Sequence, residues 1–252
     1  MANKVAHEAF NHLIGDLKAT HGDNLACVML YGSAASGDFV QIESDYNLLI
    51  ALERITPEDL RLAQAPMREW QRLGHPLPVY FTSEELRDAA DVFPIEFHQM
   101  RRARVVLYGR YPFESLEISD ENLRHQTEYE LRSKLIQLRR LYIPASADSE
   151  RLRDLMCDSL SSFATLFAPV LLLHGEEPPV MKREVVRAAV RLLKLDGGAF
   201  ERVFELREEG ADARLGEREA DELFADYMAQ VERVIEAVDA LDVSGPGGRA
   251  QA

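Results

Sequence analysis

The stretch Val28–Leu52, VMLYGSAASGDFVQIESDYNLLIAL, joins two apolar segments through a run of small, polar and acidic residues. Its first segment belongs to Leu25–Tyr31, an apolar run rich in β-forming side chains that stops at Gly32-Ser33. This pattern predicts a strand, a tight turn and the start of a helix. A glycine lets a ligand approach the backbone, a serine supplies a hydroxyl, and the N–H groups at a helix start attract anions. The turn is therefore suited to a phosphate group.

The second apolar segment follows Ser44 and is predicted to form another strand. Successive side chains of a strand point to opposite faces, so Asp45 and Asn47 share one face and their neighbours share the other. We therefore expect the two polar side chains to point to the same place.

These residues together resemble the signature of the nucleotidyltransferases of the polymerase-β type. In that family an apolar strand leads into Gly-Ser and a further glycine, and Ser-Asp-x-Asp opens the next apolar strand. The matching positions here are Gly32, Ser33, Gly37, Ser44 and Asp45. The layout, with a helical domain after the signature domain, looks most like that of the bacterial aminoglycoside adenylyltransferases.

The resemblance implies a role for each matching position. The phosphates of a nucleoside triphosphate such as ATP would be bound by the turn and serine positions, namely Gly32, Ser33, Gly37 and Ser44. In the family, two aspartates hold Mg²⁺ for transfer of a nucleotidyl group to a hydroxyl. Asp45 and Asn47 occupy these two catalytic, metal-binding positions in this chain. The resemblance leaves the acceptor open between a small molecule and a protein side chain.

Asn47 departs from the family, which has its second aspartate at this position. Mg²⁺ prefers charged oxygen ligands, and an amide carbonyl is a weaker substitute. Losing one electrostatic group of the transition state typically costs roughly 10²–10³ in rate. We therefore predict a weakened or lost metal site. Glu43 and Asp38 are replacement ligands to consider, although a solvated position at a strand entrance explains Glu43 more simply.

The family also has a third carboxylate on a later strand, where it holds a metal or accepts the proton of the attacking hydroxyl. The best candidate strand, residues 77–82, contains neither aspartate nor glutamate. Glu84 and Glu85 come after it, and Glu85 fits a helix capping box with Thr82 or Ser83. Three carboxylates remain as donors from elsewhere in the chain: Glu96, Glu128 and Glu130.

Two groups of basic residues each have two interpretations. One predicted long helix carries the first group, Arg132, Lys134, Arg139 and Arg140. A shorter segment carries the second group, Arg101, Arg102 and Arg104. Each group either reaches a triphosphate or forms a solvated face, where helical spacing pairs the first group with Glu128 and Glu130.

Composition and net charge indicate which partners and which cellular location to expect. The chain has 252 residues, 46% of them hydrophobic and 29% charged, and a formal net charge of −14. This charge argues against nucleic acid as a partner, because contact with its phosphates needs a basic surface. The charge suits a cationic acceptor, but solubility alone also explains it. We expect no membrane-spanning run, no secretory signal and two free thiols, Cys27 and Cys157, and therefore a cytoplasmic location.

The pattern of elements predicts an α+β fold. A small mixed β-sheet forms a nucleotidyltransferase domain over residues 1–112, and an all-α helical bundle follows over residues 113–243. The last residues, 244–252, are expected to be a disordered tail.

Three further expectations concern single elements within these domains. A single helix is expected from Thr56 through Trp70, and Ala103–Tyr108 is either a further strand or a docking segment. In the bundle, Pro144 is expected to end the first long helix at about Tyr142.

Three functions remain open. The chain is a nucleotide-binding protein with a weakened metal site, or an active Mg²⁺-dependent nucleotidyltransferase, or a non-catalytic interaction protein that kept the fold for its surface. We favour them in this order.

Overall fold

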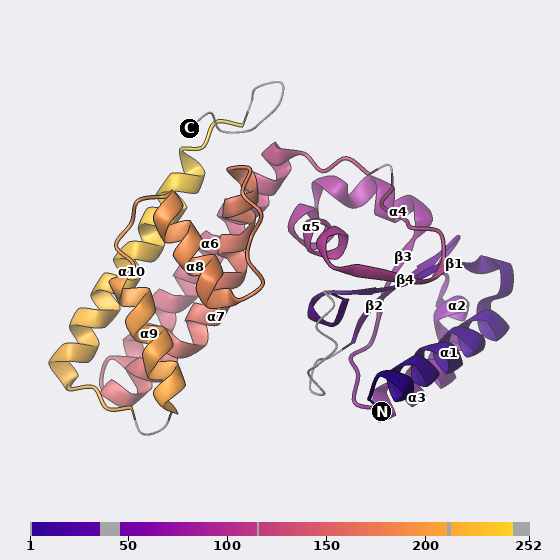
Figure 1. The fold of residues 1–252 in the computed structure, drawn as a ribbon, viewed down its shortest axis with the longest axis horizontal. Coiled ribbons are helices and arrows are strands. Elements are labelled where there is room, and N and C mark those ends of the chain that lie inside the picture. The colour runs from indigo at the N-terminus through magenta and orange to yellow at the C-terminus, as the bar shows by residue number, and fades with distance from the viewer. Residues whose placement is uncertain (1, 36–45, 115, 211–212, 244–252) are drawn as a thin grey trace. The chain divides into compact units, whose positions relative to one another are not determined.

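The computed structural model describes residues 2–35, 46–114, 116–210 and 213–243 (Figure 1). The chain divides into two compact units, Met1–Ser119 and Asp120–Ala252. The sequence placed this junction after residue 112. Phe113 and Leu116 belong to the first unit because both side chains are buried in its core. The expected tail, residues 244–252, lies outside the described residues.

The first unit contains the mixed β-sheet that the sequence predicts. The strands are β1 (Leu25–Tyr31), β2 (Asn47–Leu52), β3 (Val79–Thr82) and β4 (Arg104–Gly109), in the order β3-β2-β1-β4. Strand β1 is antiparallel to β2 and β4, whereas β2 and β3 are parallel. The last apolar segment of this unit is therefore a strand, β4, which resolves the alternative that the sequence left open.

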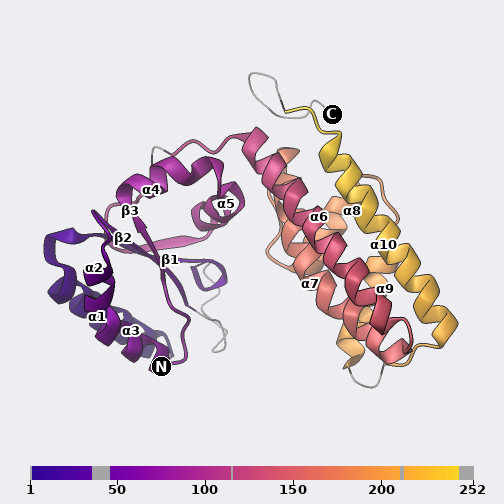
Figure 2. The same cartoon turned by 180° about the vertical axis from the view of Figure 1, so that it is seen from behind.

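Helices cover both faces of this sheet (Figures 1 and 2). One face carries α1 (Ala2–His21), α2 (Pro57–Leu62) and α3 (Gln64–Arg72). The other face carries α4 (Ser83–Asp88) and α5 (Pro94–Arg102). Short 3₁₀ turns occupy Gly22–Asn24, Ser33–Ala35 and Ala89–Asp91.

The two central strands are buried on both faces, which explains their nearly continuous apolar sequences. Leu30 and Ile50 pack with Leu17 of α1 on one side. Met29 and Leu49 pack on the other side, in a cluster that includes helix α5. This double burial holds the ends of β1 and β2, and thus the Gly32 turn, on a rigid support.

The helix expected from Thr56 through Trp70 is divided in two, and the prediction of one helix is wrong. Thr56 caps α2 in a capping box with Asp59, and this helix ends at Leu62. Pro66 lies in the first turn of α3, where a missing backbone N–H costs no helical hydrogen bond.

The second unit is a helical bundle, shown from both sides in Figures 1 and 2. Its helices are α6 (Asp120–Ala145), α7 (Ser149–Leu173), α8 (Lys182–Leu192), α9 (Gly198–Glu209) and α10 (Glu217–Asp239). Pro144 does not end α6 early but lies in its last turn. Asp148 caps α7, accepting hydrogen bonds from the backbone N–H groups of Glu150 and Arg151.

Helix α7 is long and apolar enough to cross a membrane by length and composition, so the expectation that no such run exists is wrong. However, 50% of its most apolar window is buried within the protein. Phe167 packs edge-on against Phe200 of α9, and Phe163 packs edge-on against Tyr227 of α10. These contacts make α7 a core helix of the bundle.

Candidate functional site

The Gly32 turn leaves the end of β1 in a conformation that favours glycine. Gly32 has a φ of 82°, in the left-handed region that L side chains rarely adopt. Its N–H donates to the carbonyl of Ala103 at 3.0 Å, and its carbonyl accepts from the N–H of Ala35 at 2.9 Å. The turn is therefore tied to the residue that precedes β4.

Asn47 lies beside this turn. It is the first residue of β2 and pairs with Tyr31, the last residue of β1. A Cβ added to Gly32 would lie 3.6 Å from Nδ2 of Asn47, in ordinary contact. The half-buried amide of Asn47 thus faces the turn, which the strand alternation alone did not establish.

The described structure contains only part of the predicted site. Gly32, the backbone of Ser33 and Asn47 come together as one corner of the sheet. The remaining site residues, Gly37, Ser44 and Asp45, lie outside the described residues, as do the replacement ligands Asp38 and Glu43. Their roles stay predictions.

The four described strands contain no aspartate or glutamate. Among the described residues, no group of three or more His, Cys, Asp or Glu side chains is placed to hold a metal ion. Glu85 accepts a hydrogen bond from the Thr82 N–H at 2.7 Å, which confirms the predicted capping box. An amide alone does not fit Mg²⁺, and Asp45, the carboxylate predicted to share the ion with Asn47, lies outside the described residues, so the metal site stays a prediction.

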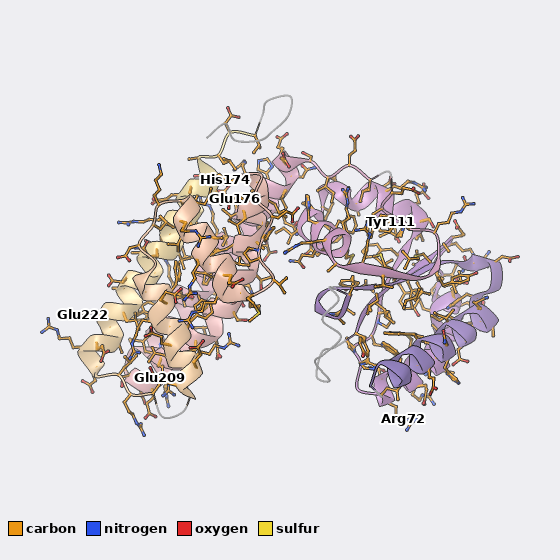
Figure 3. The ribbon with its side chains drawn as sticks, viewed as in Figure 1. Arg72, Tyr111, His174, Glu176, Glu209 and Glu222 are labelled. Carbon is orange, nitrogen blue, oxygen red and sulfur yellow. The ribbon has the colours of Figure 1, made fainter. Side chains whose placement is uncertain are left out.

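A cation, Arg104, lies at the same corner of the sheet. The sequence left its role open between contact with a triphosphate and a solvated face. Tyr31 pairs with Arg104, the first residue of β4, as well as with Asn47. The guanidinium of Arg104 lies 4.3 Å from the centre of the Tyr111 ring, and it donates to the carbonyl of Arg101 (Tyr111 is labelled in Figure 3). Burial raises the pKa of Tyr111, and the charges of Arg104 and Arg101 act in the opposite direction. Only the pairing of β4 with β1 reveals this neighbour, because the two strands are distant in sequence.

Two members of the basic group on α6 belong to a surface network in the second unit. Arg132 pairs with Glu128 at 2.7 Å, one helical turn earlier, and with Asp239 of α10 at 3.1 Å. Arg139 pairs with Glu232 of α10 at 2.6 Å. These contacts support the solvated-face interpretation, and they also engage Glu128, one of the carboxylates considered as a distant donor.

The residue before Asn47 anchors the start of β2 on the opposite face. The ring of Tyr46 lies 4.6 Å from that of His75, which in turn lies 4.4 Å from the ring of Trp70. Trp70 donates its indole N–H to the carbonyl of Pro76 at 3.0 Å. This aromatic packing holds the strand so that Asn47 projects to the other side.

No protein-family model matches the chain, and no curated protein matches its sequence. Among solved structures, the fold is similar to that of the spectinomycin adenyltransferase AAD(9) from Enterococcus faecialis, determined with ATP and spectinomycin. The TM-score is 0.56 at 12% sequence identity, and the match covers 92% of this chain and 99% of that chain. At this identity the likeness is one of fold. The chain is thus an α+β protein, with a small mixed-sheet domain and a helical domain, and its fold is similar to that of this adenyltransferase.

Proposed function

We propose that this protein binds a nucleoside triphosphate, with ATP as the expected nucleotide, at the Gly32 turn, and that its Mg²⁺ site is weakened. One observation carries the proposal: the Asn47 amide faces a left-handed glycine turn at the end of β1. The similarity in fold to an adenyltransferase that was determined with ATP supports the same function.

The proposal assigns the site residues as the sequence resemblance implies. The phosphates contact the turn and serine positions, which are Gly32, Ser33, Gly37 and Ser44. Asp45 and Asn47 are the two residues assigned to a Mg²⁺ ion. Because an amide carries no charge, this pair holds the ion less strongly than two aspartates would.

The test is a calorimetric titration of the purified chain with ATP, and with GTP, in Mg²⁺ and in EDTA. Saturable binding of ATP that gains little from Mg²⁺ is the expected result. If neither nucleotide binds under either condition, the proposed function is wrong. Binding that depends strongly on Mg²⁺ would mean that the metal site is intact.

A second candidate is an active Mg²⁺-dependent nucleotidyltransferase that moves a nucleoside monophosphate from ATP to a hydroxyl of a small molecule. The observation that favours it is the extent of the match, which includes 99% of a chain determined with both ATP and spectinomycin. The net charge of −14 suits a cationic acceptor. Release of pyrophosphate from ATP on addition of spectinomycin and Mg²⁺, abolished by Asp45→Ala, would favour this candidate over the first.

We also propose a cytoplasmic location, with no nucleic acid as partner. Cys27 and Cys157 are free, and Cys27 is buried, which raises its pKa to about 11. A buried neutral thiol is unreactive, so this residue is assigned to packing and not to chemistry.

A further inference from the structure

Three polar side chains form a row across the sheet at the Gly32 corner. Tyr31 lies in the middle, with Asn47 opposite it on β2 and Arg104 opposite it on β4. Directly opposed residues of antiparallel strands have Cα atoms about 4.5–5.5 Å apart and side chains on the same face. We call Asn47, Tyr31 and Arg104 the polar row.

Each member of the polar row can donate a hydrogen bond. The Asn47 side chain presents its NH₂ group toward Gly32, and a guanidinium has five N–H donors and no acceptor. Burial raises the pKa of Tyr31, so its hydroxyl keeps its proton. The row carries a formal charge of +1, where a pair of aspartates would carry −2. These three side chains by themselves therefore favour an anion.

The surroundings of Arg104 favour this role. The segment from Arg101 to Arg104, RRAR, contains three arginines and no acidic residue in a chain of net charge −14. In the described structure Arg104 is exposed, and its guanidinium contacts the Tyr111 ring and the Arg101 carbonyl instead of a carboxylate. Stacking fixes the plane of the guanidinium and leaves most of its N–H groups for a ligand.

We propose that the polar row binds the nucleotide's phosphate groups directly through Arg104 and Asn47, so that nucleotide binding does not require a divalent cation. This inference rests on the proposed function, and it specifies how the Gly32 site works without a full set of carboxylates. Arg104 supplies positive charge that bound Mg²⁺ would otherwise provide to the triphosphate. Free ATP is then a ligand in its own right.

The test compares the Kd for ATP in EDTA between the full-length protein and single-residue variants. Arg104→Gln should weaken binding roughly tenfold to hundredfold, as expected for a hydrogen bond to a charged group. Arg104→Lys keeps the charge but loses the planar fork, so it should bind with intermediate affinity. The matched control is Arg110→Gln, which removes the same charge just beyond the other end of β4, roughly 20 Å away. Its Kd should stay within about twofold of the unmodified protein.

A second variant, at Asn47, tests the proposal independently of any misfolding that a substitution at Arg104 causes. Asn47→Asp replaces a donor with a negative charge beside the turn, so it should weaken ATP binding in EDTA while strengthening binding in Mg²⁺. Thermal unfolding of every variant identifies any that fails to fold.

The outcomes separate this inference from the function on which it rests. If the unmodified protein binds ATP only in Mg²⁺, the inference is overturned while nucleotide binding stands. Equal affinities for Arg104→Gln and Arg110→Gln in EDTA would also overturn it, as would an Asn47→Asp variant that binds free ATP normally. If the unmodified protein binds no nucleotide at all, both the proposed function and the inference are wrong.

Discussion

Gly109, the last residue of β4, provides a direct test of the strand pairing that places Arg104 at the site. It pairs with Cys27 near the start of β1, and its φ is 79°. A Cβ added there would lie 3.0 Å from the carbonyl carbon of Ala26, closer still to its oxygen, and 3.1 Å from Cα of Cys27. Because these are backbone atoms, no side-chain rotation relieves the contact, and β4 must move away from β1.

The expected cost of Gly109→Ala follows from two contributions. The left-handed conformation costs an alanine roughly 1–2 kcal/mol. Forcing extra volume into a packed region typically costs a further 1–3 kcal/mol, about 2–5 kcal/mol in total. Gly74→Ala is the matched control, because Gly74 has a φ of 90° but no atom within 4 Å of the added Cβ. Gly109→Ala should therefore exceed this control by about 1–3 kcal/mol.

The assay is urea unfolding followed by tryptophan fluorescence. Trp70 is the chain's one tryptophan and is buried in α3, so its emission reports on the first unit and not on the helical bundle. The free energy of unfolding of each variant is taken from the midpoint and slope of the transition. If Gly109→Ala and Gly74→Ala lower this free energy by the same amount within about 0.5 kcal/mol, the close approach of β4 to Ala26 is wrong.

Three further predictions concern the turn, a buried histidine and the bundle. Gly32→Ala should lower the free energy of unfolding by only roughly 1–2 kcal/mol, because its Cβ would lie at an ordinary 3.6 Å from the Asn47 side chain. Calorimetry should nevertheless show weaker ATP binding by this variant. An unchanged affinity would contradict the role of the turn. Burial lowers the pKa of His21 despite the opposing charge of Asp59, so the folded state takes up a proton less readily than the unfolded chain. The stability of the first unit should therefore fall as pH drops below about 6.5. His21→Leu should make the stability, measured by Trp70 fluorescence, depend less on pH. An equal pH dependence in the variant and the unmodified protein would contradict this role of His21. Tyr227→Phe removes a hydrogen bond of 2.9 Å to Ser159 and should destabilise the bundle by about 1 kcal/mol. Thermal unfolding followed by circular dichroism measures this loss. Tyr129→Phe, at an exposed site, should not destabilise the bundle.

The site combines features that the sequence could and could not indicate. Asn47 is visible in the sequence as a departure from a Ser-Asp-x-Asp pattern, and the absence of a carboxylate from residues 77–82 is equally visible. The position of Arg104 beside Tyr31 is not visible in the sequence, because the two residues are far apart along the chain. The polar row therefore emerges only when β4 is paired with β1.

Local patterns in the sequence determined most of the elements. The apolar runs that became β1 and β2, the left-handed glycine between them and the cap at Asp148 all depend on neighbouring residues. The long helices of the second unit follow from apolar side chains recurring at helical spacing, a signal that needs no knowledge of distant contacts.

Tertiary structure decided the features that depend on partners. The segment Ala103–Tyr108 forms most of β4 because β1 offers it an edge to pair with. Register decided the chemistry of the site, since a slip of one residue between β4 and β1 would turn Arg104 to the opposite face of the sheet. Sequence patterns specify which residues form a strand, but only packing between distant segments specifies which side chains meet.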